Sequence, residues 1–159
     1  MPNDNAPAHP GVRFPPPLVY AVGIALGWLL GRWMVWPITT GASGTRNLAA
    51  GIFAIVFLAL VVGAVSAFRR AHTTLIPNKP ATAFVTRGPY GFTRNPMYLS
   101  LVALYVAVAL WLNSWWTFVL LPVVVFVIDR AVIAREEHYL SAAFPTEYSA
   151  YRSRVRRWL

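Results

Sequence analysis

The sequence contains no cysteine and few charged residues, and each shortage excludes whole classes of protein. Without cysteine there is no disulfide, no thiolate nucleophile and no Cys-ligated zinc. Only 12% of the 159 residues are charged, whereas a soluble domain of this length carries about a quarter. Together with a hydrophobic content of 57%, this composition predicts an all-α integral membrane protein.

Acidic residues are the scarcest of the charged types. Five Asp and Glu residues face 14 Lys and Arg residues, for a formal charge of +9. The basic residues cluster beside apolar segments, which favours orientation in a membrane and contact with anionic headgroups over nucleic-acid binding. The histidines (His9, His72 and His138) are scattered, so we expect no metal site.

Four apolar segments follow an N-terminal tail, residues 1–14, that we expect to be disordered. We expect residues 15–159 to form a single membrane domain with spans at about 18–36, 48–68, 97–112 and 116–134, since roughly 20 apolar residues cross a bilayer core. The last two segments are short and meet at Asn113-Ser114, a tight turn surrounded by tryptophans. They form either a spanning or a re-entrant hairpin, and we favour the spanning form because the tryptophans mark an interface.

Basic residues predict the topology. They concentrate between the second and third spans and after the fourth span, which places both termini in the cytoplasm by the positive-inside rule. We therefore expect a protein of the bacterial inner (plasma) membrane.

The segment from Arg87 to Tyr98 sets charge and turn residues against an apolar helix. Gly88, Pro89, Tyr90 and Gly91 form a turn by composition, and Asn95-Pro96 suits the start of a helix. Arg94 and Tyr98 are four residues apart and can share one face. Arg94 could bind a carboxylate or phosphate, or equally serve as a headgroup contact.

Two further features lie nearer the C-terminus. Glu136 and Glu137 are adjacent, so they point about 100° apart on a helix. One could pair with Arg130 or Arg135 and leave the other for a ligand. Tyr148, Tyr151 and Val155 follow with helical spacing and predict an amphipathic helix on the membrane surface.

The order of these motifs carries a resemblance. Residues 71–77 (AHTTLIP), Gly88-Pro-Tyr90, Arg94-Asn-Pro-Met-Tyr98, Glu136-Glu137 and 144–151 (FPTEYSAY) occur in one consistent sequence. This pattern resembles the membrane methyltransferase family that includes isoprenylcysteine carboxyl methyltransferase and phosphatidylethanolamine N-methyltransferase. The resemblance covers roughly the second half of the chain.

The resemblance implies an enzyme that uses S-adenosylmethionine, with its cofactor pocket on the cytoplasmic side. Carried over by motif position, the implied catalytic residues are Arg94, Tyr98 and Glu137. The implied cofactor-binding residues are Gly88, Pro89, Tyr90, Arg94, Asn95, Pro96, Tyr98, Glu136, Glu137, Tyr148 and Tyr151. This chain has Asn95 where better-known members have His, Ser100 where Gly is common, and Pro145 where Gly usually follows the Phe.

The chemistry of the cofactor agrees with this set. A glutamate attracts its sulfonium and ammonium, Arg94 suits its carboxylate, and tyrosines stack on adenine or face the sulfonium. We expect a lipophilic or lipid acceptor, whose carboxylate, amine or thiol takes the methyl group. Only an amine or thiol would need a general base, for which Glu137 and Tyr98 are candidates.

Two other interpretations remain open from sequence: a membrane reductase of sterol-reductase type that binds NADPH, and a non-catalytic membrane protein of the same fold. The oligomeric state stays open as well.

Overall fold

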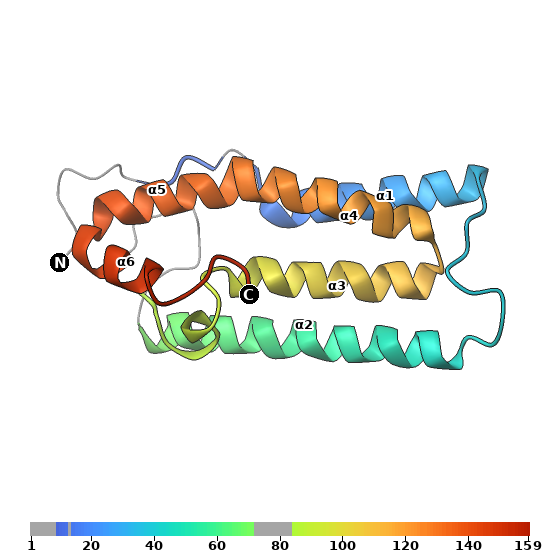
Figure 1. The fold of residues 1–159 in the computed structure, drawn as a ribbon, viewed down its shortest axis with the longest axis horizontal. Helices are drawn as coiled ribbons and strands as arrows, with labels where there is room; N and C mark the ends of the chain where they lie inside the picture. Colours follow the sequence, from blue (N-terminus) through green and yellow to red (C-terminus); the bar gives the residue numbers. More distant parts are fainter. Residues whose placement is uncertain (1–8, 13, 72–83) are drawn as a thin grey trace. The chain divides into compact units, whose positions relative to one another are not determined.

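A computed structural model describes residues 9–12, 14–71 and 84–159, and every regular element in these ranges is helical (Figure 1). The described chain divides into two compact units. One, the polar unit, comprises Met1–Arg13, Leu60–Met97 and Asp129–Leu159; the other, the apolar unit, comprises Phe14–Ala59 and Tyr98–Ile128. The expected disorder of residues 1–14 falls largely outside the described residues.

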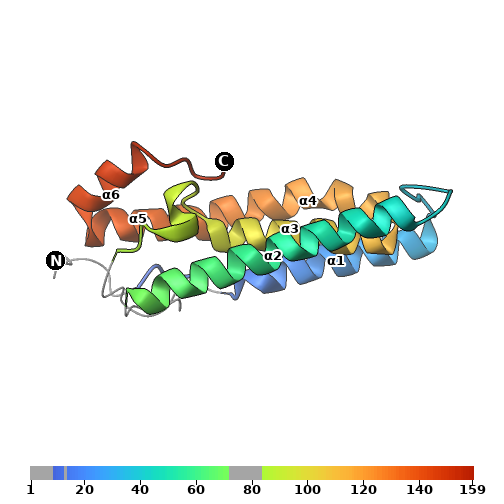
Figure 2. The same cartoon turned by 90° about the horizontal axis from the view of Figure 1, so that it is seen from below.

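The apolar unit is held together by close packing of α1 (Pro16–Trp33) against α4 (Trp115–Ile128), which lie side by side in Figures 1 and 2. Glycines on one face of α1 allow this approach. A Cβ on Gly27 would lie 2.6 Å from the Thr117 Cα, and one on Gly23 would lie 2.4 Å from a Val124 methyl group. Small residues commonly bring helices together in membranes for this reason.

A turn at Asn113 joins α3 (Pro96–Leu112) to α4, which confirms the tight turn expected there. Asn113 adopts the left-handed conformation with φ 53°, which asparagine tolerates better than most residues. Its Oδ1 accepts hydrogen bonds from the backbone N–H groups of Ile38 and Thr39, each at 3.1 Å. Trp116 also donates to the Met34 carbonyl at 2.7 Å, so the turn holds the segment that follows α1.

The polar unit contains the end of α2 (Gly44–Arg70), the short 3₁₀ helix η1 (Gly88–Gly91), the π turn η2 (Asp129–Ile133) and α5 (Ala134–Ala143). The chain runs from α4 through η2 into α5 as one continuous helix. The chain then reverses at Phe144 into α6 (Pro145–Arg152), and Figure 2 shows the following segment returning beside η1.

Two predicted helix ends need correction. The first helix ends at Trp33 rather than 36, and Met34 is already extended. Pro37 disfavours helical backbone in the residue before it, which accounts for the early end. The second helix begins at Gly44 rather than 48, because hydropathy marks only the apolar part of a helix whose first turn is polar.

Within the described residues, two helices are long and apolar enough to cross a membrane, Gly44–Arg70 and the continuous helix Trp115–Ala143. The prediction of an all-helical membrane protein is thereby supported for the described residues. Four spans and the orientation of the termini stay predictions.

The glycines of α1 and α2 give a matched test of the packing. Gly27→Ala should lower the free energy of unfolding by about 1–3 kcal/mol, because the new Cβ meets the α4 backbone. Gly51→Ala should be neutral or stabilising by up to about 1 kcal/mol, since nothing lies within 4 Å of its Cβ and alanine favours helix. Thermal unfolding in detergent measures both, and equal effects would contradict the close α1–α4 contact.

Candidate functional site

A buried ion pair joins the loop before α3 to helix α5. The Arg94 Nη2 lies 2.9 Å from the Glu137 Oε1, and the two side chains are only 10% and 12% exposed. The Arg94 Nη1 also donates to the Arg152 carbonyl at 3.4 Å. An ion pair so far removed from water orients both groups, because breaking it would leave a charge unpaired.

The turn that carries Arg94 is held by the end of α2. Gly88 has φ 65°, a conformation that glycine adopts without strain. A Cβ on Gly63 would lie 2.7 Å from the Pro89 ring, so the absence of a side chain at position 63 lets η1 lie against α2. Phe68 meets the Tyr90 ring edge-on, with centroids 5.5 Å apart. These contacts fix η1, and with it the loop that presents Arg94.

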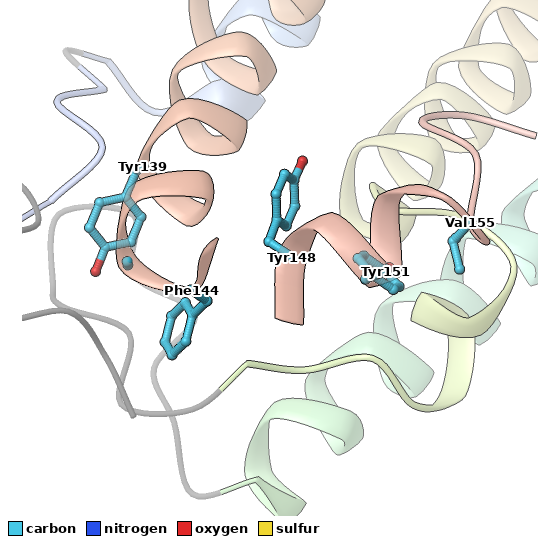
Figure 3. Close-up of a cluster of buried hydrophobic side chains, with 6 residues drawn as sticks. Tyr139, Phe144, Tyr148, Tyr151 and Val155 are labelled. Atoms are coloured by element: carbon cyan, nitrogen blue, oxygen red, sulfur yellow. The ribbon is translucent and has the colours of Figure 1, made fainter. Parts of the chain in front are cut away.

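Apolar side chains, most of them aromatic, from α5, α6 and the segment after α6 pack into one buried cluster (Figure 3). Its members are Tyr139, Ala143, Phe144, Tyr148, Tyr151 and Val155, with Phe84 and Leu140 packed against them. The Tyr151 hydroxyl donates to the Tyr90 carbonyl at 2.7 Å, which ties α6 to η1. The predicted C-terminal helix is present as α6, and its tyrosines pack inside the polar unit, where Tyr148 and Tyr151 are 2% and 4% exposed. Its place on the membrane surface stays a prediction.

One buried hydrogen-bond donor in this region, the Arg94 Nε, has no partner among the described residues. In Figure 3 the Tyr148 hydroxyl points away from the Phe144 ring. Burial, together with the charge and hydrogen bonding of the nearby Glu137 carboxylate, raises the pKa of Tyr148 to about 12. The phenol therefore stays protonated at neutral pH, and it can donate to a carboxylate.

Arg157 and Asp129 also belong to the group of charged side chains around Glu137, although no sequence motif pointed to either of them. Arg157 contacts both carboxylates: its Nη1 lies 3.1 Å from the Asp129 Oδ2, and its Nε lies 3.2 Å from the Glu137 Oε1. The Trp158 Nε1 donates to Asp129 at 3.2 Å. In the sequence, Arg157 is one of several basic residues that follow the fourth predicted span and indicate topology. No spacing rule relates it to position 129 or 137.

The remaining predicted site residues have different surroundings. The Asn95 Nδ2 donates to the Arg157 carbonyl at 2.9 Å, and Pro96 is buried beside it at the start of α3. Glu136 is half-buried. The pKa of Tyr90 is raised first by the burial of its own side chain and second by the negative charge of Glu136. Tyr98 belongs to the apolar unit, where its carbonyl accepts a hydrogen bond from Tyr20 at 3.3 Å.

Two expectations from the sequence remain, one about the motif at 71–77 and one about metal binding. Most of the motif at 71–77 falls outside the described residues. In the described part of the chain, no three His, Asp or Glu side chains come together to hold a metal ion.

Comparison with known proteins gives one family match. A sequence profile of the phospholipid methyltransferase family matches residues 45–147, well over half of the chain. An uncharacterized protein of Haemophilus influenzae is 43% identical over 63 residues, which are 40% of this chain and the whole of that protein. No solved structure matches. The family match confirms the resemblance and extends it toward the N-terminus to include α2.

Tyr148 and Tyr151 lie in the same helix and differ in one respect that can be measured. Tyr151→Phe should lower the free energy of unfolding by about 1–3 kcal/mol, because the Tyr90 carbonyl loses its donor. Tyr148→Phe should lower it by less, about 0.5 kcal/mol or below, because its hydroxyl faces the Glu137 carboxylate without a well-formed hydrogen bond. Chemical denaturation of both variants in detergent tests this, and a loss at Tyr148 as large as that at Tyr151 would contradict the difference between the two hydroxyl groups.

Proposed function

This chain belongs to the phospholipid methyltransferase family, and from that premise we propose that it transfers a methyl group from S-adenosylmethionine to a lipophilic or lipid acceptor. The family supports methyltransferase activity at a membrane. The cofactor and the class of acceptor are the proposed steps.

One observation supports the proposal above the others, the ion pair between Arg94 and Glu137. Charged residues are rare in this chain, and two from distant segments meet in a buried place. Charges are retained beside a membrane mostly where they bind or react. The same two residues were singled out by their motifs.

The side chains present fit S-adenosylmethionine, which carries a sulfonium, an ammonium and a carboxylate. The Arg94 Nε, a buried donor without a partner among the described residues, suits a carboxylate. The carboxylates of Glu136 and Glu137 suit the two cations. Tyr90 and Tyr151 come close together, since the Tyr151 hydroxyl donates to the Tyr90 backbone carbonyl, and their aromatic rings suit adenine or a sulfonium.

When bound, the cofactor would supply an electrophilic methyl group, which a nucleophilic oxygen, nitrogen or sulfur attacks while the carbon–sulfur bond breaks and S-adenosylhomocysteine leaves. The protein's own part is to orient and to exclude water. Arg94, held by Glu137 and by the Arg152 carbonyl, would fix one end of the ligand. The aromatic cluster of α5 and α6 would keep water from that end. A carboxylate acceptor needs no base, whereas an amine or thiol would give up its proton to Glu137.

We further propose that residues 15–159 work as one membrane domain with four spans and both termini in the cytoplasm of a bacterium. The basic residues support this orientation. Outside the tail, all of them except Arg32 and Arg46 fall in the polar unit. The acceptor would then enter laterally from the inner leaflet.

Calorimetry on the detergent-purified protein tests the cofactor. We expect S-adenosylhomocysteine to bind with micromolar affinity and NADPH not to bind. Arg94→Ala and Glu137→Gln should each weaken this binding by about tenfold or more, because charge-assisted hydrogen bonds contribute about 1.5–3 kcal/mol.

Arg70→Gln and Glu147→Gln, which change exposed residues of the same charge, serve as controls and should leave the affinity unchanged. Binding of NADPH alone would instead support a reductase. Binding of neither ligand would support a non-catalytic protein, and unchanged affinity in both site variants would remove them from the pocket.

A further inference from the structure

The segment after α6 makes an unusually dense set of polar contacts for a stretch without regular structure. The Arg94 backbone N–H donates to the Arg156 carbonyl at 2.9 Å. The Arg157 carbonyl accepts from the Thr93 hydroxyl at 3.2 Å and from the Asn95 Nδ2 at 2.9 Å. The loop that presents Arg94 therefore also holds the backbone of Arg157.

The side chain of Arg157 joins two carboxylates of one long helix. Its Nε and Nη2 donate to the two oxygens of Glu137, and its Nη1 donates to both oxygens of Asp129, at 3.1 and 3.3 Å. A planar guanidinium with five N–H donors is suited to such a double contact, and an ammonium is not. Glu137 thus lies between two guanidinium groups, those of Arg94 and Arg157.

The π turn explains why Asp129 and Glu137 share a face. Eight residues along a regular α-helix, at 100° each, would leave the two side chains about 80° apart. A π turn accommodates one additional residue, which reduces the difference to about 20°. The π turn spans Asp129–Ile133, between the two positions, and single π turns are frequent at functional sites.

Glu137 has two anchors of different kinds. Arg94 lies in the loop for which we propose ligand contact, and Arg157 is fixed on the other side by Asp129 and by the loop's own hydrogen bonds. Removing Arg157 would leave Asp129 and Glu137 as two like charges on one face with fewer cations to hold them. The orientation of Glu137 against Arg94 would then loosen.

We propose that Arg157 is a positioning residue. By donating hydrogen bonds to both Asp129 and Glu137, it orients the Glu137 carboxylate against Arg94 before the charged ligand binds. This inference rests on the proposed function. Its physical basis is preorganisation, since a site whose charged groups are already oriented loses less on binding. Asp129 acts only through Arg157 and has no direct part in ligand contact.

The test compares variants by calorimetry with S-adenosylhomocysteine. Arg157→Gln should weaken binding about tenfold, and Arg157→Lys should recover only part of that loss because an ammonium cannot bridge both carboxylates. Arg154→Gln removes an exposed arginine of the same segment and should leave the affinity within twofold. Asp129→Asn should weaken binding about threefold in the natural protein and have no further effect in the Arg157→Gln variant.

Unfolding temperatures of the same samples separate this role from a purely structural one. If Arg157 only stabilises the fold, Arg157→Gln lowers the unfolding temperature and leaves the affinity of the folded protein unchanged. That result would overturn the proposal. The proposal would also be overturned if the double variant lost affinity for S-adenosylhomocysteine by the product of the losses measured for Asp129→Asn and Arg157→Gln alone. If the natural protein binds S-adenosylhomocysteine and Arg157→Gln binds equally well, only the positioning role fails; if the natural protein does not bind it, the proposed function fails too.

Discussion

The polar unit depends on one carboxylate shared by two arginines. Glu137 in α5 pairs with Arg94 from the loop before α3 and with Arg157 from the segment after α6. Three stretches that are far apart in sequence therefore meet at a single side chain. Because the Glu137 side chain is only 12% exposed, losing either arginine would leave this poorly hydrated carboxylate with one cation in place of two.

Charge and apolar surface are separated between the two units. Of all its residues, the apolar unit has only Arg32 and Arg46 as charged side chains, and glycines bring its helices α1 and α4 close together. The polar unit carries the hydrogen bonds and ion pairs that join η1, α5 and α6. Such a division suits an enzyme that takes a charged ligand from water and a lipophilic partner from the bilayer.

Much of this arrangement could be predicted from the sequence, since apolar length and turn residues indicate helices directly. Asn113 and the apolar segments predicted the helices and their turn, and scarcity of charge drew attention to Arg94 and Glu137. The contact of Arg157 with both Asp129 and Glu137 could not be predicted. Helical periodicity assumes a regular α-helix, and the π turn changes which residues share a face of the helix. The burial of Tyr148 and Tyr151 was missed for a different reason: an amphipathic pattern shows which side is apolar and does not show whether lipid or protein covers it.

A double-mutant cycle on Arg94 and Glu137 addresses the shared carboxylate most directly. Arg94→Gln, Glu137→Gln and the double variant would be compared for their affinity for S-adenosylhomocysteine. If the two side chains act as one unit, the double variant binds about as weakly as the weaker single variant, with a coupling free energy of about 1–3 kcal/mol. Losses that add to within about 0.5 kcal/mol would mean that the two residues act independently, and that the ion pair does not organise the site.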